Sequence, residues 1–190
     1  MEIHTPRLLL REFKEDDWHF TNLYESNEEV MRYQTSEVRS SKESQEYIRQ
    51  CLEEAREEPR TLIDLAIVLR TTDMLIGRVG MKVDYDAEEA VLWYILNQTY
   101  WNKGYTTEAA GALMHFGFED LQLHRIWADC DPRNVGSYRI MEKLGMRREA
   151  HFRENIFIKG HWCDSYVYAL LDHEWRTQNG EVNWQSKTRN

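Results

Sequence analysis

A short polar turn between two regularly patterned segments carries the strongest chemical signal in the sequence. An apolar run of strand length (residues 91–96) precedes the turn, Gly104 lies within it, and apolar residues recur at helical spacing after it. A strand, a tight glycine turn and a helix N-terminus direct several unpaired backbone N–H groups at one point, where the helix dipole favours negative charge. The sequence therefore predicts an anion site, formed by Trp101, Asn102, Lys103, Gly104, Tyr105, Thr106 and Thr107.

A second polar motif, Asn-Val-Gly-Ser at residues 134–137, begins a predicted helix directly after a predicted strand. Asn134 is expected to cap this helix, because its side-chain oxygen can accept a bond from one of the first backbone N–H groups. Capping does not account for Ser137, three residues further along. The Gly-x-Ser-x-Gly turn of serine hydrolases is absent, so Ser137 is not interpreted as a nucleophile.

Carboxylates that could serve as a general base gather around one predicted turn and the strand after it. They are Asp84, Asp86, Glu88 and Glu89, with Asp64 further away in a predicted buried strand. Glu89, at the end of this turn, is the catalytic candidate among them. Carboxylates at hairpin tips are usually solvated turn residues, and a water relay from backbone carbonyls is the alternative.

The seven histidines do not show the spacing of a metal site. The sequence has no His-Glu-x-x-His motif, and the cluster of His161, Cys163 and Asp164 falls on a predicted strand, where neighbours point to opposite faces. We therefore expect no metal ion.

Composition narrows the class of protein. The chain has 190 residues and a formal net charge of −9, which argues against a nucleic-acid surface, because such a surface needs a basic stripe. No apolar run approaches the roughly 18 residues of a membrane helix, and no signal peptide is recognisable, so no membrane partner is expected. Three scattered cysteines indicate reduced thiols in a cytoplasmic protein.

The predicted elements suit one domain over residues 1–175, followed by a frayed polar tail over residues 176–190. A strand is expected over residues 3–13, then a helix that begins after Asp16-Asp17 and buries Trp18, Phe20 and Leu23. The acidic face of the next helix (residues 43–57) is either simply solvated or attracts amines. Further strands are expected at residues 61–69, 74–83, 91–96, 123–130, 146–157 and 163–171, with helices from Gly104 to about residue 121 and from residue 134 to 145.

Four stretches occur in an order that is typical of one enzyme family. They are TPRLLLR (5–11), WNKGYTTEA (101–109), DPRNVGSYRIMEKLGM (131–146) and the closing Gly160, Asp164, Tyr168–Leu171 and Trp175. Together they resemble the GNAT acetyltransferase superfamily, and within it the ribosomal-protein N-acetyltransferase (RimJ/RimL-like) branch, over roughly residues 3–175. The resemblance implies an α+β fold with a mixed, mostly antiparallel sheet, splayed at the central strand and covered by helices on both faces.

The resemblance also implies a site and a reaction. Acetyl-CoA would be the co-substrate, with its pyrophosphate on the turn at residues 101–107 and its pantetheine arm on the backbone of Tyr94, Ile95 and Leu96 and on Asn134. An amine would attack the thioester directly, and Ser137 would protonate the leaving thiolate. The sequence departs from the superfamily pattern at Trp101, where Gln or Arg is usual, and at Thr106, where Gly or Ala is usual. Met141 stands where many members carry a proton-donating Tyr.

The acceptor is expected to be a protein N-terminus or a small amine, handled by a monomer or a homodimer. An α-amine is easier to reconcile with the lack of an obvious base, because more of it is neutral at pH 7. Asp164 either organises the acceptor site or makes structural hydrogen bonds. The alternatives are a CoA-binding regulatory module with little turnover, which Met141 and Thr106 favour, and transfer of another acyl group such as succinyl.

Overall fold

The chain forms eight strands and six helices over residues 1–179, the part that this computed structural model describes. The strands are β1 (Glu2–His4), β2 (Leu8–Arg11), β3 (Leu62–Leu69), β4 (Met74–Asp84), β5 (Glu89–Leu96), β6 (Arg125–Cys130), β7 (Arg147–Ile158) and β8 (His161–Leu171). The helices are α1 (Trp18–Glu25), α2 (Glu28–Met31), α3 (Ser41–Glu54), α4 (Tyr105–Glu119), α5 (Val135–Lys143) and α6 (Asp172–Asn179), with 3₁₀ turns at Glu15–Asp17 and Gln98–Tyr100.

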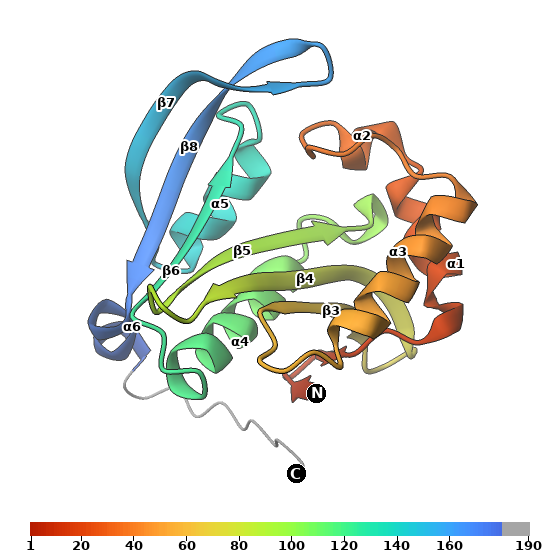
Figure 1. The fold of residues 1–190 in the computed structure, drawn as a ribbon, viewed down its shortest axis with the longest axis horizontal. Coiled ribbons are helices and arrows are strands. Elements are labelled where there is room, and N and C mark those ends of the chain that lie inside the picture. The colour runs from red at the N-terminus through yellow and green to blue at the C-terminus, as the bar shows by residue number, and fades with distance from the viewer. Residues whose placement is uncertain (180–190) are drawn as a thin grey trace.

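All the strands join one sheet in the order β1-β2-β3-β4-β5-β6-β8-β7 (Figure 1). Neighbouring strands are antiparallel except for β5 and β6, which are parallel. The prediction of a mixed, mostly antiparallel sheet is therefore confirmed. No helix within residues 1–179 combines the length and the apolar character needed to cross a bilayer.

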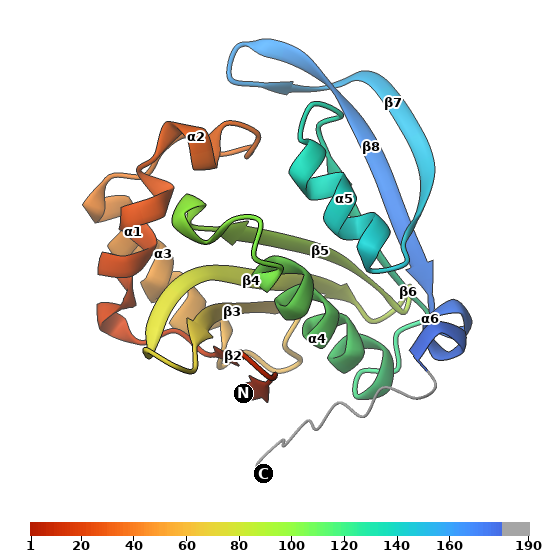
Figure 2. The same ribbon diagram turned by 180° about the vertical axis from the view of Figure 1, so that it is seen from behind.

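Helices cover both faces of the sheet, as predicted. The helices α4 and α5 lie on one face (Figure 2), where Leu92 and Leu96 of β5 join the larger core with Leu113 of α4. The helices α1 and α3 lie on the other face, where Ile95 of β5 packs with Ile48 of α3. Alternate residues of β5 thus enter two different cores, as the two-residue period of a strand requires.

The sheet opens between β5 and β6. These strands pair only at Glu89–Arg125, Ala90–Ile126 and Val91–Trp127, although β5 continues to Leu96 and β6 to Cys130. Beyond Val91 the two strands diverge, and we call the space between residues 92–96 and 128–130 the opening (Figures 1 and 2). The predicted splay at the central strand lies here.

The single N-terminal strand predicted over residues 3–13 is wrong. The chain forms two short strands, β1 and β2, that pair with each other and are joined by a turn in which the Thr5 N–H donates to the Leu8 carbonyl (3.0 Å). Pro6 lies in this turn and has no N–H to give to a ladder, so the strand is interrupted there.

The buried side predicted for the first helix is wrong at Phe20 and Leu23, whereas Trp18 is partly buried against the core, as predicted. Phe20 and Leu23 are 41% and 69% exposed, whereas Tyr24 and Glu25 are buried. The apolar pattern fails because the helix presents a polar group to the sheet: Glu25 forms an ion pair with Arg78 of β4. The inward face of α1 thus carries the core residue Tyr24 together with the ion-paired Glu25.

The C-terminal prediction needs a correction at its start. Residues 176–179 continue α6 rather than beginning a frayed tail, and the helix is held by Trp175, which is 4% exposed and stacks on Phe118 of α4 at 5.4 Å between ring centroids. The rest of the predicted tail, residues 180–190, lies outside the described residues.

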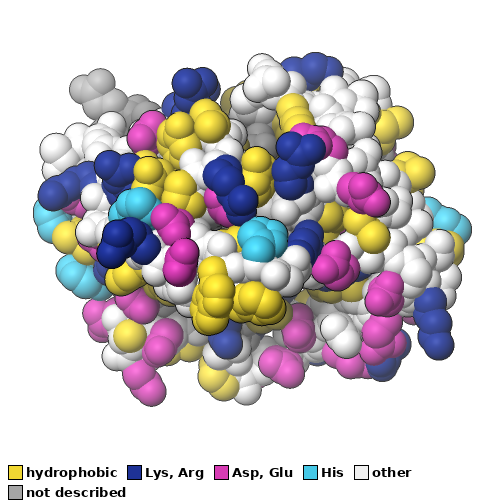
Figure 3. Space-filling model, turned by 90° about the horizontal axis from the view of Figure 1, so that it is seen from above, with side chains coloured by type: hydrophobic (Ala, Val, Ile, Leu, Met, Phe, Trp, Pro, Cys, Tyr) yellow, Lys and Arg dark blue, Asp and Glu magenta, His cyan; other side chains and the backbone are white. Residues whose placement is uncertain are grey.

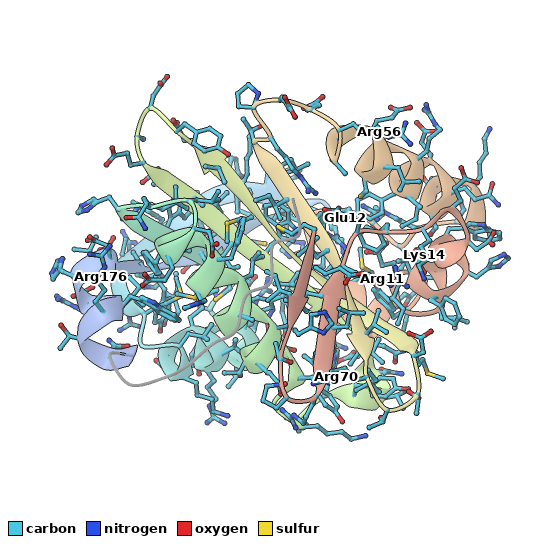
Figure 4. The ribbon with its side chains drawn as sticks, turned by 90° about the horizontal axis from the view of Figure 1, so that it is seen from below. Arg11, Glu12, Lys14, Arg56, Arg70 and Arg176 are labelled. Carbon is cyan, nitrogen blue, oxygen red and sulfur yellow. The ribbon has the colours of Figure 1, made fainter. Side chains whose placement is uncertain are left out.

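A set of ion pairs fixes the edge of the sheet where β2 leads toward α1 (Figure 4). Arg11 bonds to Asp17 (2.6 Å), and Glu12 receives bonds from Arg60 (2.6 Å) and from the amino group of Met1 (3.1 Å). These bonds anchor β1 and β2, and with them the Thr5–Arg7 turn that reaches the start of α4.

A buried polar cluster joins α1 and α3 to the sheet. Arg78 donates to Glu25 (2.8 Å) and to Asp64 (2.9 Å), Arg39 donates to the second oxygen of Glu25 (2.6 Å), and the Tyr47 hydroxyl bonds to Asp64. Two arginines balance two carboxylates, so the cluster is neutral as a whole. Removing one member would leave a buried charge without its partner.

We predict that Arg78→Met lowers the free energy of unfolding by about 3–5 kcal/mol, because Asp64 would lose its buried counter-charge and Glu25 would keep only its bond to Arg39. Urea unfolding followed by circular dichroism would measure the change. Arg49→Met is the matched control, since Arg49 also bridges two carboxylates, Glu46 and Glu53, but on the solvated face of α3. Equal midpoints for the two variants would contradict this account of the cluster.

Candidate active site

The turn before α4 offers free backbone N–H groups at a helix N-terminus. Gly104 occupies the N-cap position in a left-handed conformation (φ 77°), which a residue without a Cβ adopts at little cost. For the backbone N–H groups of residues 102–107, no acceptor occurs within the described chain. The turn can therefore bind an anion such as a phosphate through main-chain amides.

Arg7 adds positive charge to this turn. The residues predicted for the anion site do not include Arg7. Its guanidinium donates to the Glu108 carboxylate (2.5 Å) and to the Lys103 carbonyl (2.9 Å), and the Thr5 hydroxyl donates to Glu108 (2.6 Å). Arg7 thus offsets the one acidic side chain in the first turn of α4. Its place in the TPRLLLR stretch was the available signal, but only the fold brings residue 7 to residue 108.

Several side chains of the turn are used within the protein. The Trp101 indole N–H donates to the Leu96 carbonyl (2.8 Å), and Lys103 Nζ donates to the Thr99 carbonyl (3.1 Å). Tyr105 lies beneath the Arg7 guanidinium, 4.6 Å from its ring centroid. These side chains hold the shape of the turn, which leaves the backbone as the part free to bind a ligand.

Two hydroxyl groups meet beside the opening. The Tyr94 hydroxyl of β5 lies 3.0 Å from Ser137 Oγ and donates to the Ser137 carbonyl (3.0 Å). Burial raises the pKa of Tyr94, so the phenol stays protonated. The sequence predicted a role only for the backbone of Tyr94. The role of its hydroxyl group could not be predicted, because the contact between β5 and α5 depends on tertiary structure.

The start of α5 holds Ser137 at this position. Asn134 caps the helix, and its side-chain oxygen accepts from the Ser137 N–H (3.2 Å), so the capping prediction is confirmed. The thiol of Cys130, the last residue of β6, is also close to the Ser137 hydroxyl. Burial raises the pKa of this thiol to about 12. The end of β6, the start of α5 and the side chain of Tyr94 thus meet at one point.

The predicted base is not brought to this point. Glu89 begins β5, in the part that still pairs with β6, and its carboxylate bonds to Arg125 (2.9 Å). Seven residues of extended strand separate it from Leu96, which corresponds to roughly 23 Å. Asp84 accepts bonds from the N–H groups of its own turn, and Asp64 belongs to the buried cluster.

The hairpin of β7 and β8 closes one side of the molecule toward α2. Lys159 at its tip donates to the Met31 carbonyl (2.6 Å). Asp164 accepts from His151 (2.7 Å) and from the Glu154 N–H (2.9 Å), which favours its structural role. Within residues 1–179 no group of His, Cys, Asp or Glu is arranged to hold a metal ion. Seen from above, this side mixes basic, acidic and hydrophobic side chains (Figure 3).

Comparisons with known proteins agree with this geometry. Residues 7–147 match the family model of the acetyltransferase (GNAT) domain. The N-acetyltransferase YnaD of Bacillus subtilis is 37% identical over 92% of this chain and 99% of its own. The Escherichia coli ribosomal protein uS5-alanine N-acetyltransferase is 30% identical over 44% of this chain and 43% of its own.

Solved structures give the same result. A GNAT-family acetyltransferase from Bacillus anthracis is 33% identical and superposes with a TM-score of 0.83, over 92% of this chain and 100% of that one. RimL, a ribosomal L7/L12 α-N-protein acetyltransferase in complex with coenzyme A, shares the fold at 16% identity (TM-score 0.79; 90% and 98% covered). The chain belongs to the GNAT acetyltransferase family, in its RimJ/RimL-like branch, and is an acetyl-CoA-dependent acyltransferase.

Proposed function

We propose that the protein transfers the acetyl group of acetyl-CoA to the α-amine of a protein or peptide N-terminus. One observation carries the proposal. The free backbone amides of residues 102–107 lie at one end of β5's free edge, and the paired hydroxyls of Tyr94 and Ser137 lie beside the opening. Phosphates and a thioester, joined by an extended arm, fit these two ends.

The backbone would hold most of the coenzyme. The amides of residues 102–107 would bind the pyrophosphate, with Arg7 adding positive charge. Residues 94–96 of β5 have no strand partner on the side of β6. The backbone groups on that side, apart from the Leu96 carbonyl that accepts from Trp101, are therefore available to bond the pantetheine amides as a neighbouring strand would. RimL, whose structure contains coenzyme A, supports this use of the fold.

The reaction would be direct transfer within a ternary complex. The neutral amine attacks the thioester carbonyl, a C–N bond forms, and the C–S bond breaks. A backbone N–H near Leu96 would stabilise the oxyanion. Ser137 would give its hydroxyl proton to the thiolate, and the Tyr94 hydroxyl, 3.0 Å away, is placed to support it where Met141 offers no proton. This donor pair argues against the alternative of a CoA-binding module without turnover.

The chemistry favours an α-amine as the acceptor. An α-amino group has a pKa near 8 and is roughly a tenth neutral at pH 7, whereas lysine-type amines are neutral only to a few parts in ten thousand. The names of two similar proteins agree: one acetylates an alanine of ribosomal protein uS5, and RimL is an α-N-protein acetyltransferase.

The purified protein should acetylate peptides with a free N-terminal amine faster than it acetylates polyamines or aminoglycosides. Release of the CoA thiol measured against this acceptor panel, with mass spectrometry of the products, would test the proposal. N-terminally blocked peptides that still contain lysine are the control. A higher kcat/KM for a polyamine than for any peptide would show that the acceptor is a small amine instead of a protein N-terminus. No transfer to any acceptor would favour the regulatory module.

Ser137→Ala should lower kcat by roughly 10–100-fold and leave the Kd for CoA nearly unchanged, because a thiolate is already a tolerable leaving group. Steady-state kinetics and calorimetry with CoA would measure the two effects. Ser41→Ala, at the exposed start of α3, is the matched control. Turnover at the wild-type rate in Ser137→Ala would remove this serine from the mechanism.

A further inference from the structure

Asp129 lies on β6 where that strand has already parted from β5. The last pair between the strands joins Val91 to Trp127, so Asp129, two residues further, has a strand neighbour only in Val167 of β8. It is solvent-exposed, and within residues 1–179 no side chain bonds to its carboxylate. An acceptor entering the opening could therefore reach this carboxylate without displacing a protein partner.

Alternation along β6 places Asp129 and Ser137 on opposite faces of the sheet. Ala128 and Cys130 point into the core under α4 and α5, and the Cys130 thiol lies at the Ser137 hydroxyl. Asp129, between them in the sequence, points to the other face. Trp93 of β5 points to that same face, since its neighbours Leu92 and Tyr94 contribute to the α4 core.

We propose that Asp129 is the general base of the reaction and accepts the proton that the attacking ammonium must lose. The assignment rests on the proposed function and adds a residue that the sequence left open. A thioester in the opening would have a proton acceptor on the face where the amine arrives and Ser137 on the face where the sulfur leaves. A proton acceptor, Asp129, and a proton donor, Ser137, would thus lie on opposite sides of the thioester carbonyl.

The protons balance in this scheme. The Asp129 carboxylate takes one proton from the ammonium, directly or through one water, and leaves a neutral amine. The nitrogen lone pair forms the C–N bond, and the C–S bond breaks as the intermediate collapses. The thiolate takes the hydroxyl proton of Ser137, the second amine proton replaces it, and Asp129 returns its own proton to solvent. The sum is an amide, a CoA thiol and one released proton.

The surroundings of Asp129 suit a base. Although the Asp129 side chain is exposed, the surrounding protein removes part of the water around its carboxyl and raises its pKa above the usual value, which makes the carboxylate a stronger proton acceptor. The charged neighbours on its strand are already paired: Arg125 bonds to Glu89 (2.9 Å), and Asp131 is held by Arg133 (2.9 Å). The nearby titratable group on the other face is the Cys130 thiol, which stays protonated at neutral pH.

The indole of Trp93, on the same face, is directed away from this carboxylate. The Trp93 indole lies over Gly80, where a Cβ would collide with the ring, and its N–H points to Asp64 (3.3 Å). The ring therefore extends over β4 toward β3, on the side of β5 that faces away from β6.

Asp129→Asn tests the assignment, because it keeps the size of the side chain and removes the base. With the best peptide acceptor, kcat at about pH 7 should fall by ~10²–10³-fold. The deficit should shrink to less than about tenfold as the pH rises above the amine pKa of ~8, where solution supplies neutral amine. The Kd for CoA, measured by calorimetry, should stay within about twofold of the wild-type value.

Two variants serve as controls. Glu89→Gln changes the carboxylate at the paired end of β5 and should keep the wild-type pH profile. Asp129→Ser should repeat the loss and its recovery at high pH, which separates the missing base from any effect specific to asparagine or to its folding. A deficit that is absent or the same at every pH would overturn the assignment and leave the proposed function standing. A wild-type protein without transfer to any amine would overturn both.

Discussion

Two parallel strands that stop pairing inside a sheet leave backbone groups that need another partner. In this protein β5 and β6 pair for three residues and then diverge after Val91 and Trp127. The divergence gives β5 a free edge, brings the Tyr94 hydroxyl to Ser137, and places Cys130 and Asp129 on opposite faces of the same short strand. Without it the sheet would be continuous and closed to an extended ligand.

The rest of the fold keeps that opening in place. On one face, the cluster around Arg78 holds α1 and α3 against β3 and β4, so β4, the strand that pairs with β5, rests on a buried, charge-balanced layer. On the other, α4 packs on β5, and Arg7 ties the first turn of α4 to the N-terminal strands. The anion-binding turn and the opening are therefore built on the same strand and helix.

Sequence patterns predicted the fold well where a motif is local. The Gly104 turn, the Asn134 cap and the mixed sheet follow from spacing, composition and resemblance, and the structure has all three. Prediction failed where contacts between residues far apart in the sequence determine the arrangement. The inward face of α1 includes Glu25, whose buried ion pair with Arg78 of β4 cannot be read from the apolar pattern of the helix. The base was sought near Glu89 because carboxylates cluster there, whereas strand alternation and the splay together point to Asp129.

The central claim is that coenzyme A occupies the opening with its phosphates on the turn at residues 101–107. Hydrogen–deuterium exchange of the whole chain, with and without saturating CoA, tests it most directly, because exchange reports each free amide. The account predicts slower exchange at residues 102–107 and 92–96, and little change in α3. Protection confined to other segments, or none at all, would contradict it.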